Sequence, residues 1–161
     1  MRIVVQKVKQ ASVTVDSQIV SSIQRGLLIL VGISTADTEA EVEKLSSKLL
    51  KLRIFEDETV SQFTLLAKTK KGTKPDLHLA AKGKYIQDIC IIFLLKKYQK
   101  EILTKDYLFK GPQAKPLYDS FLNKLRLGLG DEHVKDGVFG AMMDVALIND
   151  GPITITLDSD E

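Results

Sequence analysis

A continuous apolar run constrains the fold of this chain more than any other feature. Residues 27–33 (LLILVGI) follow Gly26, and the run has none of the alternation of apolar and polar residues that marks a half-buried strand. A strand covered on both faces of a sheet has this pattern, and its length fits a strand better than a helix. The run therefore predicts a β-strand that is buried on both sides.

Alternation of apolar and polar residues predicts further strands. Between Ile3 and Val15, apolar residues alternate with polar ones, but the phase breaks near Val8. This pattern indicates a strand with a bend or a bulge. A turn is expected at Asp16-Ser17. The remaining expected strands are residues 19–23, 60–66, 139–148 and 153–157, the last two separated by a turn at Asn149-Asp150-Gly151-Pro152.

Two segments have the spacing of amphipathic helices. Thr38 and Glu41 form a capping-box pattern, which predicts a helix start. Pro116 suits the first turn of a second helix, which Gly128 or Gly130 can end. The apolar faces of the two helices are Val42, Leu45, Leu49 and Leu52, and Leu117, Phe121 and Leu125.

The order of these elements predicts the fold class. About six strands mostly follow one another without intervening helices, which favours an α+β domain with a mostly antiparallel sheet and two packed helices. The 161 residues suit one domain. No repeat or linker divides the chain.

Composition excludes several function classes. Cys90 is the only cysteine, and the two histidines are far apart in the sequence, so neither a disulfide nor a metal site is expected. The longest apolar run, residues 89–95, is far shorter than the roughly 20 residues of a membrane span. The first ten residues lack the apolar stretch of a signal peptide. We expect a cytoplasmic protein without a membrane partner. The net charge of +2 neither favours nor excludes a nucleic-acid partner.

Residues 61–64 are the first candidate site. Two hydroxyls and a carboxamide, from Ser61, Gln62 and Thr64, could orient an ester or a ribose, and backbone N–H groups near Phe63 could hold an oxyanion. The alternative is an ordinary strand with polar residues on its exposed face. A Ser61, Asp76 and His78 triad lacks support, because no Gly-x-Ser-x-Gly elbow is present.

Three other segments could bind a ligand. Gly151-Pro152 is either an ordinary turn or a cis peptide that directs backbone carbonyls toward a ligand. Four lysines in residues 68–74 are either a solvated loop or phosphate contacts. Residues 139–143 are either core strand or an apolar wall for an adenine. The residues of interest in the last two segments are Lys70, Lys71, Phe139, Ala141 and Met142.

Together these segments resemble the D-aminoacyl-tRNA deacylase family. The matching stretches are MRIVVQKVKQASVTVD, GLLILVGIS, LRIFEDE, VSQFTLLAKTKKGTKPDLH, PLYDSFLNKLR and VKDGVFGAMMDVALINDGPITITLDSD. The resemblance implies a barrel-like α+β fold and a homodimer without a metal. It also implies hydrolysis of the ester between a D-amino acid, or mischarged glycine, and the terminal adenosine of tRNA.

The resemblance also assigns roles to residues. It places Ser61, Gln62, Phe63 and Thr64 in the catalytic pocket. Gly151-Pro152 corresponds to a Gly-cis-Pro motif that reaches into the partner subunit's pocket and leaves no room for an L side chain. The expected contacts with tRNA and adenosine are Lys70, Lys71, Phe139, Ala141 and Met142. The alternative function is a tRNA- or DNA-associated binding protein without hydrolase activity.

The sequence departs from the family in two places. After Glu58 a segment of a dozen or more residues is missing, and residues 84–111 have no family counterpart. In residues 84–110, sixteen of 27 are Phe, Ile, Lys or Tyr, which have A/T-rich codons, and codons for Gly83-Lys84-Tyr85 can contain a splice donor. We interpret residues 84–111 as a translated, unspliced intron within a single deacylase domain of residues 1–161. The alternative is a lineage-specific amphipathic helix.

Overall fold

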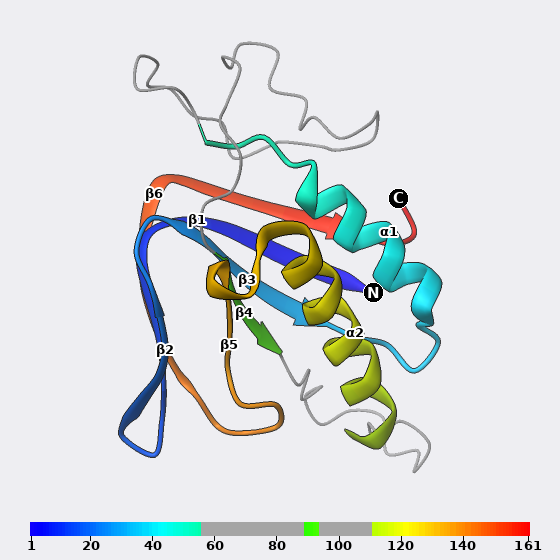
Figure 1. The fold of residues 1–161 in the computed structure, drawn as a ribbon, viewed down its shortest axis with the longest axis horizontal. Helices are drawn as coiled ribbons and strands as arrows, with labels where there is room; N and C mark the ends of the chain where they lie inside the picture. Colours follow the sequence, from blue (N-terminus) through cyan, green and yellow to red (C-terminus); the bar gives the residue numbers. More distant parts are fainter. Residues whose placement is uncertain (56–88, 94–110) are drawn as a thin grey trace, which may run out of the picture.

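A curled, six-stranded mixed sheet with two helices on one face forms the fold (Figure 1). The computed structural model describes residues 1–55, 89–93 and 111–161. The strands are β1 (Arg2–Val15), β2 (Gln18–Ile23), β3 (Gly26–Gly32), β4 (Ile89–Phe93), β5 (Val134–Asp136) and β6 (Asp144–Asp158). The helices are α1 (Glu39–Leu50), α2 (Gly111–Leu129) and the short 3₁₀ helix η2 (Asp131–His133). This arrangement confirms the α+β class.

Strand β1 organises the sheet. One edge pairs antiparallel with β3 and then with β2, and the other edge pairs antiparallel with β6. Strands β4 and β5 continue beyond β3 in parallel pairings. The sheet curls until Ser21 on β2 donates a hydrogen bond to the carbonyl oxygen of Asp136 on β5. The result is a nearly closed barrel rather than an open sheet.

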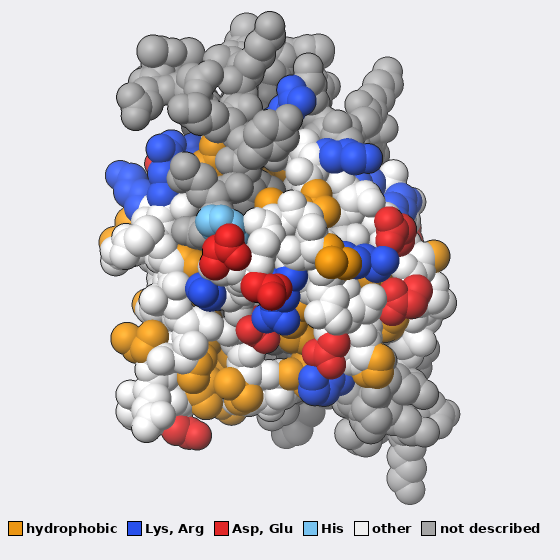
Figure 2. Space-filling view, in the orientation of Figure 1, with side chains coloured by type: hydrophobic (Ala, Val, Ile, Leu, Met, Phe, Trp, Pro, Cys, Tyr) orange, Lys and Arg blue, Asp and Glu red, His pale blue; other side chains and the backbone are white. Residues whose placement is uncertain are grey.

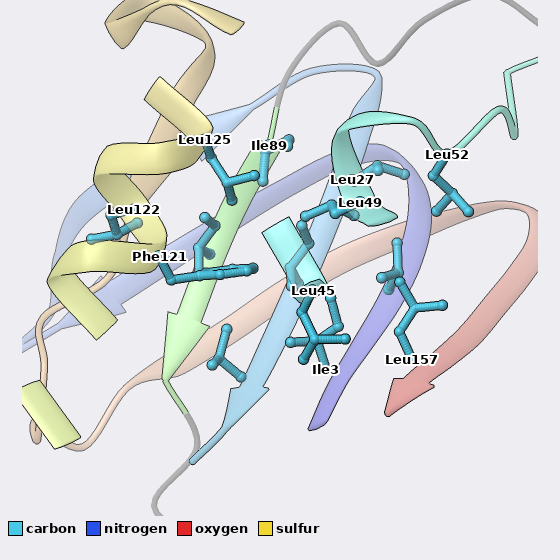
Figure 3. Packing of buried hydrophobic residues seen from close by; sticks show 14 of the residues in the cluster. Ile3, Leu27, Leu45, Leu49, Leu52, Ile89, Phe121, Leu122, Leu125 and Leu157 are labelled. Carbon is cyan, nitrogen blue, oxygen red and sulfur yellow. The ribbon is translucent and has the colours of Figure 1, made fainter. Parts of the chain in front are cut away.

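The apolar run at residues 27–33 is buried on both faces, as predicted. Leu27, Ile29 and Val31 belong to the core under the helices, where they meet Leu45, Leu49 and Phe121 (Figure 3). Leu28 points the other way, into a second cluster with Val8, Val13 and Cys90 inside the curled sheet. Strand β3 therefore has no face in water.

The phase break near Val8 coincides with irregular pairing between β1 and β6. Gln6 pairs with Thr154 and Val8 with Asn149, so two steps along β1 correspond to five along β6. Beyond the irregularity, the inward-facing residues of β1 join the second cluster instead of the helix-covered core. The prediction of a bulge is confirmed, and so is the turn at Asp16-Ser17, where both residues have positive φ.

The prediction of two strands separated by a turn at residues 149–152 is wrong. Residues 144–158 form one strand, β6, and both of its halves pair with β1 in the same direction. Residues 150–153, which have no register partner on β1, are a bulge in this strand. The strand also begins at Asp144 and not at residue 139, because residues 137–143 form a loop. Local turn signals do not distinguish a hairpin from a bulge when the pairing partner is distant in sequence.

Helix α1 follows the predicted pattern. Thr38 Oγ1 accepts from the Ala40 backbone N–H at 3.2 Å, and Glu41 accepts from the Thr38 backbone N–H at 2.7 Å. Helix α2 begins at Gly111, so the prediction that Pro116 lies in its first turn is wrong. The helix ends at Leu129, just before Gly130, whose φ of +100° favours glycine.

Thr38→Ala is expected to lower the free energy of unfolding by about 1 kcal/mol, because it removes the side-chain cap of α1. The pKa of Glu41 lies below its ordinary value mainly because the Thr38 hydroxyl donates to it, so the variant should also raise this pKa. Urea denaturation measures the first effect. Thr38→Ser keeps the hydroxyl and should retain the stability; an alanine variant as stable as the serine variant would contradict the capping role.

Part of residues 84–111, which the sequence predicts to lack a family counterpart, lies in the core. Ile89, Cys90 and Ile91 are fully buried in β4, which lies between β3 and β5. Packed in β4, these apolar side chains are shielded from solvent. The predicted strand at residues 60–66 lies outside the described residues. In the described part of the chain, no helix is long and apolar enough to span a bilayer.

Candidate functional site

The bulge of β6 places Gly151 and Pro152 at an exposed corner of the sheet. The peptide bond between them is cis, and Gly151 has a φ of +120°, which L side chains rarely adopt. A Cβ added to Gly151 would lie 3.0 Å from Cγ1 and 3.2 Å from the backbone N of Ile153. The corner therefore needs glycine at residue 151.

Charged residues from three segments meet next to this corner. Lys7 Nζ lies 3.4 Å from Asp150 Oδ2, and Arg25 Nε lies 3.6 Å from the same oxygen. Lys7 and Arg25 also lie over the ring of Phe55, at 5.5 and 5.9 Å from its centroid. We call Lys7, Arg25, Phe55 and Asp150 the Lys7 cluster. It joins β1, the β2–β3 connection and the segment after α1 to the bulge.

The residues expected to line an adenine pocket do not form one wall. Phe139 packs against the helix-covered core, with its ring centroid 5.4 Å from that of Tyr118. Ala141 is half-buried, and Met142 is 92% exposed. Met143 instead packs against the cluster inside the sheet. The alternation expected for a strand fails here because these residues lie in a loop.

These residues are also distant from Gly151-Pro152 within one chain. Six strand residues, 144–149, separate the loop from the bulge, which corresponds to about 20 Å at roughly 3.3 Å per residue. Ser61, Gln62, Phe63, Thr64, Lys70 and Lys71 lie outside the described residues. The loop at residues 137–143 and the bulge with Gly151-Pro152 are therefore two separate places in one chain. The sequence analysis predicted that both belong to the same site.

Other chemistry is limited among the described residues. No group of three or more His, Cys, Asp or Glu side chains there could hold a metal ion. Burial, with a smaller contribution from Asp136, raises the pKa of Cys90 to about 11, so its thiol stays protonated at neutral pH. On the face in Figure 2, basic and acidic side chains are interspersed, and no large area of one sign is visible among the coloured residues.

The fold and its corner define a small α+β protein whose curled sheet carries a cis glycine–proline bond on a bulged strand. A sequence model of the family described as D-Tyr-tRNA(Tyr) deacylase matches residues 4–111 and 106–158. A D-aminoacyl-tRNA deacylase from Saccharomyces cerevisiae is 49% identical, and one from Candida glabrata is 46% identical; both alignments cover 100% of each chain. The chain belongs to this family.

Two solved structures share the fold of this chain. A protein described as c-Myc DNA Unwinding Element Binding Protein is 37% identical with a TM-score of 0.74, and 98% of each chain is covered. A probable eukaryotic D-amino acid tRNA deacylase has a TM-score of 0.68 over 97% of each chain, and at 17% identity this likeness shows the fold alone. The fold is therefore common to this chain and both structures.

The alignment with the Saccharomyces cerevisiae relative spans 178 positions, 17 more than the 161 residues of this chain. Because the whole chain is covered, the relative has residues that this chain lacks. The place of that loss, after Glu58, stays a prediction, and so does the origin of residues 84–111.

Sequence reasoning missed three members of the Lys7 cluster: Lys7, Arg25 and Phe55. A signal was present for Lys7, because it continues the inward-facing series of Ile3 and Val5, where an apolar side chain is expected. Arg25 and Phe55 carry no such signal, since their proximity depends on how the chain folds around the bulge.

Proposed function

We propose that this chain hydrolyses the ester linking a D-amino acid to the 3′-terminal adenosine of tRNA, a chiral proofreading step. The observation that carries this proposal is the 49% identity, over the full length of both chains, to a protein named D-aminoacyl-tRNA deacylase. In this reaction water adds to the ester carbonyl, the bond to the ribose oxygen breaks, and that oxygen takes a proton. Mischarged glycine is a second substrate of the same site.

The catalytic roles follow from the family motif. Backbone N–H groups near Phe63 and Thr64 hold the carbonyl oxygen as its negative charge develops. Ser61, Gln62 and Thr64 position the ester and the ribose, and the 2′-hydroxyl of the tRNA itself assists. Lys70 and Lys71 contact phosphates, and Phe139, Ala141 and Met142 face the adenosine. No metal or other cofactor takes part, and the site of action is the cytoplasm, where charged tRNA is used.

A homodimer completes the site in this proposal. Gly151-Pro152 is exposed and lies about 20 Å along β6 from the loop at residues 137–143, so a second copy could bring the two corners together. Ile19 and Ile148 are 70% and 51% exposed, and both pair with residues of one face of β1. Exposed isoleucines of this kind gain from burial against a second copy. The carbonyls of Gly151-Pro152 then exclude L side chains.

The purified chain is expected to release D-tyrosine from D-Tyr-tRNA and to leave L-Tyr-tRNA intact. Thr64→Ala should slow the release by about 100-fold, the size of effect that loss of positioning produces. Initial rates on radiolabelled aminoacyl-tRNA measure both. Thr35→Ala changes an exposed threonine in the loop before α1 and serves as the matched control. A Thr64→Ala variant that is as fast as this control would contradict the assignment of Thr64.

The competing function is nucleic-acid binding without hydrolysis. It draws on one similar structure, described as a DNA unwinding element binding protein, which is 37% identical to this chain. The relatives at 49% and 46% identity carry the deacylase name instead. Wild-type protein that binds D-Tyr-tRNA and releases no amino acid would decide for the binding protein.

A further inference from the structure

Lys7 is a charged residue in a position built for an apolar one. It follows Ile3 and Val5 on the face of β1 that meets the helix-covered core, and only 5% of it is exposed. A buried ammonium group is costly unless an opposite charge compensates it. The fold therefore has to supply a partner, and that partner is Asp150, whose carboxylate lies 3.4 Å away.

The partner belongs to the bulge of β6. Asn149 pairs with Val8 and Thr154 pairs with Gln6, and the β1–β6 register gives residues 150–153 no partner on β1. The cis Gly151–Pro152 bond lies within this unpaired stretch. Because these residues have no register partner on β1, side-chain contacts help to set the orientation of the backbone here. The ion pairs of Asp150 with Lys7 and Arg25 are such contacts.

The Lys7 cluster restrains its own cations as well. Phe55, only 4% exposed, faces Lys7 and Arg25 at centroid distances of 5.5 and 5.9 Å, within the range of cation–π attraction. Arg25 is half-exposed, whereas Lys7 is enclosed, so water screens the Lys7–Asp150 pair less than the Arg25–Asp150 pair. Lys7 is therefore the stronger of the two anchors.

We propose that Lys7 is a positioning residue for stereochemical selection, acting through Asp150 to fix the direction of the Gly151-Pro152 carbonyls. This inference rests on the proposed function, in which those carbonyls exclude L side chains. Exclusion by backbone atoms works only when these atoms keep their place, because steric rejection falls steeply with displacement. Lys7 touches neither the substrate nor the reacting atoms in this role.

The test compares initial rates on D-Tyr-tRNA and L-Tyr-tRNA for the full chain and its variants. Lys7→Met removes the charge and keeps the length of the side chain; we expect the D/L rate ratio to fall by about tenfold, within the range of steric discrimination. Lys7→Arg keeps a cation and should retain the ratio. Lys9→Met removes an exposed lysine from the same strand and should also retain it. A purely structural role would lower both rates together and leave their ratio unchanged.

Asp150→Asn removes the charge of the other partner in the Lys7–Asp150 ion pair. If Lys7→Met does not fold, this variant tests whether the ion pair supports selectivity. It should also lower the D/L ratio. A selective wild-type enzyme whose Asp150→Asn and folded Lys7→Met variants are equally selective would overturn the inference and leave the proposed function intact. A wild-type protein that cleaves neither ester would instead overturn the proposed function, and the inference with it.

Discussion

Replacing Ile91 by aspartate is expected to lower the free energy of unfolding by about 4 kcal/mol or more. Ile91 is fully buried in β4, where its backbone pairs with Ile29 on one side and Asp136 on the other. The substitution removes core packing and places a carboxylate in an apolar cluster. Circular dichroism during urea denaturation measures the effect, since the chain has no tryptophan.

Leu127→Asp is the matched control for this substitution. Leu127 lies on α2 and is 88% exposed, so the same exchange of an aliphatic residue for aspartate should change stability by less than about 1 kcal/mol. Equal stability of the two variants would show that residues 89–93 do not occupy the core. Residues 89–93 would then belong to an exposed insertion. The alternative interpretation of residues 84–111, a lineage-specific amphipathic helix, implies such an insertion.

The elements that the sequence predicted correctly are those with a local cause. Residues 27–33 are apolar because both faces of β3 are covered, and Thr38 with Glu41 closes the start of α1 by contacts within four residues. Strand β4 has the same apolar character, but its parallel pairing with β3 joins residues about sixty positions apart. Residue pattern carries no information about that pairing.

The errors have the same physical origin. The segment at residues 149–152 has the composition of a turn, and only the register against β1 shows that it is a bulge. Pro116 has the preference of a first turn, yet α2 begins five residues earlier. In both places tertiary pairing or packing overrides a local preference.

One feature of the candidate site, the cis peptide bond, was predictable from a sequence motif. Gly151-Pro152 was singled out from two residues, and its bond is cis in the structure. The ion pairs that surround it were not predictable, because Arg25 and Phe55 are close to Asp150 only after the sheet has curled. Motifs thus mark candidate groups, while the residues that contact those groups become visible only in the fold.

The last prediction concerns the two departures from the family. A repaired chain, without residues 84–111 and with the segment missing after Glu58 restored from the Saccharomyces cerevisiae relative, is expected to deacylate D-Tyr-tRNA about 100-fold faster than this chain. The reason is positional. Residues 89–93 fill the place between β3 and β5 in this chain. In the repaired chain that place is free for the restored residues and the predicted strand at residues 60–66, which carries Ser61 to Thr64.

Two intermediate forms separate the contributions of the two changes. Deleting residues 84–111 alone removes β4 without a replacement. The resulting chain should unfold at a lower temperature than both the original chain and the repaired chain. Restoring the missing segment alone leaves two strands competing for one place in the sheet, so its rate should lie between those of the original and repaired chains. Initial rates and thermal unfolding midpoints of all four forms are compared at one protein concentration, because dimer formation depends on it.

Equal activity of the original and repaired chains would refute this account, since a strand from an unrelated segment would then serve the site as well as the family's own. The transcript gives an independent test of the origin of residues 84–111. A mature message that retains their codons would exclude the intron interpretation and make β4 a genuine strand of the protein. A message without them, joined to the codons missing after Glu58, would identify the repaired chain as the form that the mature message encodes.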